Sequence, residues 1–141
     1  MLSNDNGHET LAKFLNELGY KAKYDSEEDY VESAMAGLKV LVYWYESGSI
    51  QLFCGIKMGE DSGFGATEVN AFNKSYRFAK VYMTDEGDLA IENDALIDWS
   101  RESAFSNLQK IIGLWEGSLS LLKEAMADAK AHQHQLATPV D

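Results

Sequence analysis

Cysteine, proline and basic residues are scarce in this chain, and two of these scarcities exclude whole classes of site or partner. The single cysteine, Cys54, allows no internal disulfide and cannot form a thiolate zinc site. Twelve lysines and arginines stand against twenty-three acidic residues, giving a net charge of −11. Nucleic acid and anionic lipid both require a positive face, so neither is expected as the main partner.

Long apolar runs are also missing. No run approaches the ~20 residues that a membrane span needs, and residues 1–10 lack the basic flank and apolar stretch of a signal peptide. We therefore expect a cytoplasmic protein that binds no membrane.

The composition that remains is that of an ordinary globular domain. Of the 141 residues, 45% are hydrophobic and 25% are charged. A chain of this length buries roughly two-thirds of its unfolded surface, so a core can form without disulfides. We place a single domain at residues 1–131. Residues 132–141 lose the helical pattern and contain the only proline, Pro139, so we expect a flexible tail there.

Three segments carry apolar residues at helical spacing. The first has Asn6 and Ser3 as candidate N-caps and Gly19 as a stop signal. The second follows Thr67, which we predict as its N-cap. The third is the longest and the most regular. The three apolar stripes comprise Leu11, Phe14, Leu15 and Leu18; Val69, Phe72 and Tyr76; and Phe105, Leu108, Ile112, Trp115, Leu119, Leu122 and Met126.

Between these helices the apolar pattern changes to the alternation of strands. Short turns separate consecutive strands, which predicts hairpins and an antiparallel sheet. Three or four strands precede the second helix, and two follow it. The order αβββαββα predicts an α+β two-layer sandwich with the helices on one face of the sheet. The expected strands are residues 21–25, 30–36, 39–46, 50–58, 79–83 and 89–91.

The middle of the chain resembles a known family. Residues 69–82, VNAFNKSYRFAKVY, resemble the central segment of the YbjN-like proteins, in which a helix ending in a Phe-Asn pattern is followed by a basic and aromatic stretch leading into a strand. Residues 85–89 resemble the next hairpin, and the collinear order extends over roughly residues 10–128. The resemblance implies a fold like that of type III secretion chaperones, which often dimerise, and a bacterial sensory transduction regulator. It supplies no catalytic residues.

The usual catalytic and metal-binding sets are missing. Cys54 lies on the apolar face of its expected strand, which favours a buried structural thiol over a nucleophile. His8, His132 and His134 all lie near the termini, where a core does not orient them as bases or ligands. The loop 59–65 lacks the lysine of a phosphate-binding loop. We expect no enzyme, no cofactor and no metal.

Aromatic residues give the best indication of function. Tyr43, Trp44 and Tyr45 put rings on both faces of one strand, and Phe53 follows in the next strand. Helices cover one face, so the other is expected to form a dimer contact or to receive a partner segment. Packing within one chain is the alternative. No proline lies in any expected strand, so a peptide could also pair with a sheet edge.

Two pairs of helical residues have more than one interpretation. Asn70 and Asn73 lie three residues apart, on neighbouring positions of the helix. In the structural interpretation one of them ties the helix to an adjacent strand or loop, and in the functional interpretation they anchor a bound peptide. Gly113 and Gly117 each cost about 1 kcal/mol in a helix interior. Close approach of the sheet or of a second subunit would compensate.

These observations favour a non-enzymatic protein-binding domain, a homodimer whose acidic surface suits basic partners. The alternative is a small-molecule sensor with an apolar pocket between the last helix and the sheet, lined by Trp115, Phe105 and Met83. An enzyme with an unrecognised site is the third hypothesis.

Overall fold

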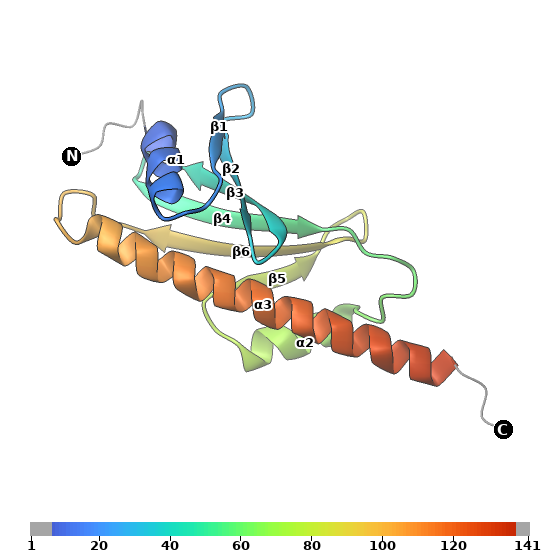
Figure 1. The fold of residues 1–141 in the computed structure, drawn as a ribbon. Coiled ribbons are helices and arrows are strands. Elements are labelled where there is room, and N and C mark those ends of the chain that lie inside the picture. Colours follow the sequence, from blue (N-terminus) through green and yellow to red (C-terminus); the bar gives the residue numbers. More distant parts are fainter. Residues whose placement is uncertain (1–6, 138–141) are drawn as a thin grey trace.

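The computed structural model describes residues 7–137, which form three helices and a six-stranded sheet (Figure 1). This architecture confirms the predicted α+β class. Of the three or four strands expected before the second helix, the structure has four, because residues 23–25 pair with the strand that follows them. In chain order the elements are α1 (Gly7–Glu17), β1 (Lys23–Asp25), β2 (Tyr30–Met35), β3 (Leu38–Trp44), β4 (Ser49–Ile56), α2 (Ala66–Ser75), β5 (Lys80–Met83), β6 (Leu89–Leu96) and α3 (Ala104–Ala137).

The sheet is antiparallel throughout, with strand order β1-β2-β3-β4-β6-β5. A two-residue turn joins β2 to β3, and its residues Ala36 and Gly37 have φ values of 53° and 75°. Positive φ at both positions is the geometry of a type I′ turn, whose twist matches that of the strands. Because β4 pairs with β6, the segment from α2 to β5 lies beyond β6, and β5 forms an edge of the sheet.

Strand alternation places the core on one face. On this covered face the odd residues of β2 and the even residues of β3 and β4 are buried. The long helix α3 crosses this face, and α1 packs against β1–β3 (Figure 1). The arrangement confirms that the helices lie on one side of the sheet. The facing core residues include Val31, Met35, Val40, Val42, Ile50, Leu52, Cys54, Leu108, Ile112, Trp115, Leu119 and Leu122.

Helix α2 begins one residue before the predicted N-cap, Thr67. Gly65 occupies the N-cap position, and its N–H donates to Oε1 of Glu68 at 2.9 Å. The Glu68 carboxylate therefore satisfies one backbone donor of the helix start. The predicted caps of the first helix, Asn6 and Ser3, lie outside the described residues.

The C-terminal part of α3 extends past the predicted domain and contacts the loop 59–65. Helix α3 continues to Ala137, six residues beyond the predicted domain boundary, and the side chains of residues 131–135 are exposed along it. The loop 59–65 packs on α3, because Phe64 is buried and a Cβ on Gly63 would lie 2.7 Å from the Ala129 carbonyl oxygen.

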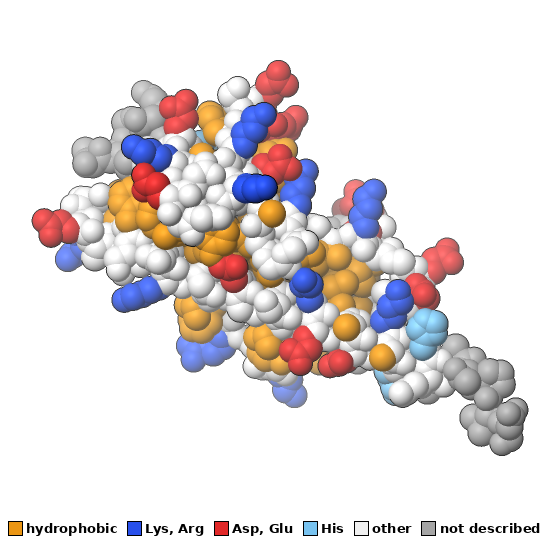
Figure 2. All heavy atoms as spheres, viewed as in Figure 1, with side chains coloured by type: hydrophobic (Ala, Val, Ile, Leu, Met, Phe, Trp, Pro, Cys, Tyr) orange, Lys and Arg blue, Asp and Glu red, His pale blue; other side chains and the backbone are white. Residues whose placement is uncertain are grey.

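The surface seen from the helix side mixes acidic and basic side chains (Figure 2). Hydrophobic side chains are visible between them along α3. Among residues 7–137, no helix has a stretch that is both long and apolar enough to cross a bilayer.

Candidate functional site

The face of the sheet opposite the helices is called here the open face. Its side chains come from the alternate positions of each strand, so they point away from α1 and α3. Most of them remain partly exposed, whereas Ala90 of β6 is buried. The central residues are mostly aromatic, and the residues toward β6 are polar. The open face comprises Tyr30, Leu41, Tyr43, Tyr45, Phe53 and Tyr82, with Gln51, Glu92 and Asp94.

The rings of Tyr30, Tyr43 and Tyr45 form a contiguous strip on β2 and at the end of β3, and Phe53 lies beside it on β4. Tyr43 makes an edge contact with Tyr30, with ring centroids 5.8 Å apart, and a stacked contact with Tyr45 at 6.4 Å. Leu41 lies opposite Phe53 in the β3–β4 register. The Phe53 ring lies beside Gly55, where an added Cβ would be 3.5 Å from it. An aromatic strip of this kind is more typical of a contact surface than of a solvated sheet face.

A hydrogen-bonded border runs along the β6 side of this strip. Gln51 donates to Oδ1 of Asp94 at 3.1 Å and accepts from the Tyr45 hydroxyl at 3.2 Å. The Tyr82 hydroxyl donates to Glu92, and this bond, together with burial, raises the pKa of Tyr82 to about 12. Burial, followed by the charges of Asp94 and Glu92, raises the pKa of Tyr45. Lys80 Nζ lies 3.4 Å from Oε2 of Glu92 and pairs with that carboxylate, so Asp94 is the acidic group that the border leaves for a basic partner.

The structure divides the four predicted contact residues between the two faces. Tyr43, Tyr45 and Phe53 lie on the open face. Trp44 lies on the covered face, where it is 7% exposed and its ring centroid is 4.7 Å from that of Trp99. A Cβ on Gly7 would lie 2.3 Å from the Trp44 ring, so the first turn of α1 packs directly on it. Trp44 is a core residue and offers no surface to a partner.

The two predicted polar anchors also have different environments. The Asn73 amide accepts from the N–H of Val81 at 3.0 Å and donates to the Val81 carbonyl at 2.8 Å. It therefore ties α2 to the outer edge of β5, which is the structural interpretation of this residue. Asn70 is exposed on α2.

A second asparagine, which the sequence analysis missed, closes the other edge. Asn16 of α1 makes the same pair of bonds with Ala22, both at 2.9 Å, just before β1 begins. Asn16 and Asn73 precede the edge residues that they bond by six and eight residues, and this spacing is the only sequence signal for such an edge-binding asparagine. The two edge strands have only three and four residues. Asparagine side chains also occupy the backbone groups of Val81 in β5 and of Ala22 just before β1, which limits the addition of a peptide strand that the absence of proline suggested.

His8 was expected to be unoriented near the terminus, but it is buried and held by three groups. Its Nε2 accepts the Trp44 N–H at 3.0 Å, and its ring stacks on Tyr24 with centroids 5.1 Å apart. The Asp29 carboxylate is 3.5 Å from Nδ1. Asp29 has a φ of 61°, so the chain turns there and β2 starts too late to pair with Trp44. His8 takes the place of that missing strand partner.

The remaining nucleophile and ligand candidates are not placed for chemistry. Cys54 is buried, and burial raises the pKa of its thiol to about 11, so the thiol stays protonated at neutral pH. His132 and His134 are exposed near the end of α3. Within residues 7–137 no group of three His, Cys, Asp or Glu side chains could hold a metal ion.

The residues predicted to line an apolar pocket have separate surroundings. Trp115 is fully buried in the core, and Met83 is 39% exposed on β5. Phe105 packs on Phe14 with ring centroids 4.9 Å apart, beside a hollow of about 380 Å³ between α1 and α3.

Gly113 and Gly117 are exposed on α3, and a Cβ at either position would meet nothing within 4 Å. The expected approach of the sheet to these glycines is therefore wrong. The contact with a second subunit stays a prediction.

Known proteins share this fold. No curated protein sequence matches the chain significantly. The crystal structure of YbjN from E. coli, described as a putative transcription regulator, aligns with a TM-score of 0.66 and 16% identity over 90% of this chain and 93% of that one. The Yersinia pestis type III secretion chaperone SycH, solved with a stable fragment of YscM2, aligns with a TM-score of 0.53 and 10% identity over 85% and 97%. A family model described as YbjN, putative bacterial sensory transduction regulator, matches residues 8–128, so the chain belongs to the YbjN family.

Proposed function

We propose that this chain is a non-enzymatic, homodimeric protein-binding domain, with the open face of its sheet as the binding surface. The observation that carries the proposal is the aromatic strip of Tyr30, Tyr43, Tyr45 and Phe53, which stays partly exposed while the opposite face is buried under α1 and α3. Exposed apolar patches rimmed by polar residues mark interaction sites in soluble proteins.

The fold relationship supports a protein as the ligand. SycH, which shares the fold, was crystallised with a fragment of another protein. Asp94 in the border and the net charge of −11 favour a partner with basic side chains beside its apolar ones. A stable dimer through this face would bury about 800 Å² per subunit.

The test compares one substitution on the open face with one elsewhere. Phe53→Asp places a charge in the aromatic strip, and Leu114→Asp places the same charge on α3, where Leu114 is 46% exposed. Sedimentation equilibrium is expected to show a dimer that Phe53→Asp converts to a monomer and Leu114→Asp leaves intact. Circular dichroism checks that both variants fold.

A photo-crosslinking residue at position 53 or 114 then tests binding in the native cell. A protein adduct at position 53, but not at 114, supports the proposed surface. A wild-type monomer with no adduct at position 53 contradicts the proposal.

A further inference from the structure

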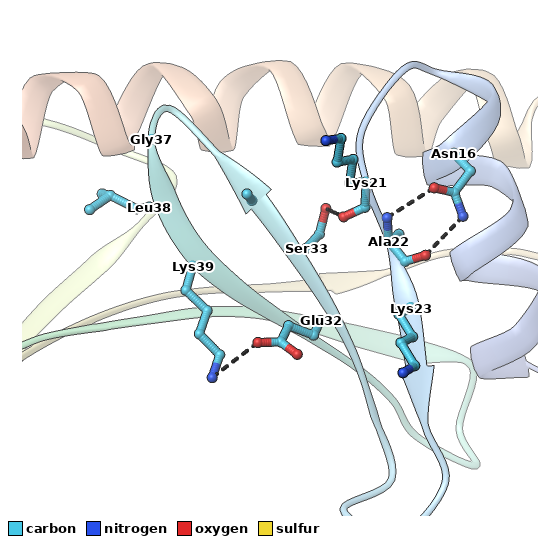
Figure 3. Close-up of a pocket in the computed structure, with 10 residues that line it drawn as sticks. Asn16, Lys21, Ala22, Lys23, Glu32, Ser33, Gly37, Leu38 and Lys39 are labelled. Carbon is cyan, nitrogen blue, oxygen red and sulfur yellow. Dashed lines mark hydrogen bonds and ion pairs between the residues drawn. The ribbon is translucent and has the colours of Figure 1, made fainter.

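A groove of about 530 Å³ opens beside β2 at the start of β1, where β2 extends beyond its pairing with β1 (Figure 3). Lys23 is the first residue of β1, and before it the chain leaves the edge of β2 toward α1. Residues 21–22 form one wall of the groove, and hydrogen bonds hold them in place. Asn16 bonds both backbone groups of Ala22, and the Ser33 hydroxyl donates to the Lys21 carbonyl at 3.0 Å. The groove therefore has a fixed backbone on both sides.

The groove is basic in an otherwise acidic chain. Three of the twelve basic residues, Lys21, Lys23 and Lys39, line it, together with a single carboxylate, that of Glu32. Figure 3 shows the Lys23 and Lys39 side chains on either side of Glu32, with Lys39 Nζ 3.1 Å from its Oε1. One carboxylate cannot neutralise three ammonium groups, so the groove keeps a local positive charge that attracts anions.

A backbone donor also points into this groove. In a two-residue hairpin the residues flanking the turn, here Met35 and Leu38, exchange hydrogen bonds, and the pairs alternate from there. Ala34 is therefore in a non-bonded pair with Lys39, and its N–H and C=O point outward from β2. Among the described residues they have no backbone partner. A backbone N–H beside ammonium groups is a common element of anion sites.

We propose that this groove binds the oxyanion group of a ligand, a carboxylate or a phosphate, through Lys23, Lys39 and the N–H of Ala34, while Lys21, whose side chain points toward α3 in Figure 3, adds to the local positive charge. Lysine ammonium groups act as point charges and do not discriminate between these two anions by geometry. Glu32 weakens binding by occupying Lys39. The groove shares the open face with the proposed protein-binding strip, through Glu32 and Lys39, but no ring of that strip lines it.

The first experiment titrates the ¹⁵N-labelled full chain with sodium phosphate and, separately, with sodium acetate, at an ionic strength held constant with sodium chloride. We expect saturable shifts of the amide resonances of Ala34 and of its neighbours across the groove. The anion that saturates at the lower concentration identifies the ligand group. Shifts no larger than those caused by chloride alone would overturn the proposal.

Two substitutions with opposite expected effects exclude a general structural cause. Lys23→Gln removes a positive charge and is expected to weaken binding about fivefold, whereas Glu32→Gln removes the competing carboxylate and is expected to strengthen it by a similar factor. Lys57→Gln, in a different hollow beside α3, serves as the matched control and should change nothing. Affinity changes of the same sign in the first two variants, or no change in either, would contradict the site.

Discussion

Removal of the His8 imidazole tests how α1 is attached to the sheet. Its Nε2 is the acceptor for the Trp44 N–H at 3.0 Å, in a buried position. His8→Ala leaves this N–H without a partner, which costs about 1–3 kcal/mol of unfolding free energy, and it also removes the stack on Tyr24. We expect urea unfolding, followed by circular dichroism, to show a loss of about 2–3 kcal/mol.

The same contact predicts how stability depends on pH. Burial lowers the pKa of His8 from its ordinary value of 6.5, and the nearby Asp29 carboxylate only partly opposes this effect. The unfolded chain therefore binds a proton at a higher pH than the folded chain does. The His8 contribution is fully present above pH 6.5 and is lost as the pH falls from there through the lower folded-state pKa.

His8→Gln is the control for this prediction, because its amide oxygen can accept a hydrogen bond but does not titrate. The free-energy difference between wild type and His8→Gln, measured between pH 7.5 and 5, removes the contribution of all other groups. We expect this difference to shift in favour of the variant as the pH falls. A difference independent of pH, or one that shifts toward wild type, would refute the reasoning, since the latter means that the protonated ring pairs favourably with Asp29.

Three further predictions concern single side chains. Asn73→Ala breaks two bonds to β5 and should lower the unfolding free energy by about 1–3 kcal/mol, whereas Asn70→Ala should leave chemical unfolding almost unchanged. Gly113→Ala and Gly117→Ala should each raise stability by about 1 kcal/mol in thermal melts, because the added methyl group meets open space; a loss of dimer would instead show that a second subunit packs there. Cys54 should resist thiol reagents at pH 8 until denaturant unfolds the chain, and rapid labelling of the native protein would contradict its burial.

The periodicity of the sequence predicts the elements well, because helices and strands that bury one side carry their pattern locally. The alternation in residues 50–58 identifies β4, and the heptad stripe identifies α3. The periodicity cannot predict which side of β3 is covered by helices. Tyr43, Trp44 and Tyr45 give both faces similar rings, and only the packing of α1 and Trp99 on Trp44 decides which face is the core.

The polar contacts were harder to foresee because they join distant segments. His8 and Trp44 are 36 residues apart, and nothing in the local sequence pairs them. The lysine groove depends on the register of β1 against β2 and on the residue at which β1 begins. A three-residue strand with no apolar repeat has no periodic signal, so neither the register nor the groove follows from the sequence.

The open face also restricts how two copies could associate through it. One row of paired residues crosses all six strands and reads Lys23, Glu32, Leu41, Phe53, Glu92, Lys80, with charges mirrored about an apolar centre. Consider two such faces stacked with their strands aligned, related by a two-fold axis through the middle of the row. Whether this axis runs along the strands or along the row, lysine lies over lysine and glutamate lies over glutamate. Like charges at close range oppose association. A homodimer whose two-fold axis passes through the apolar centre of this row is therefore expected to cross its strands at a large angle, so that only the apolar centres overlap and the charged ends stay in solvent.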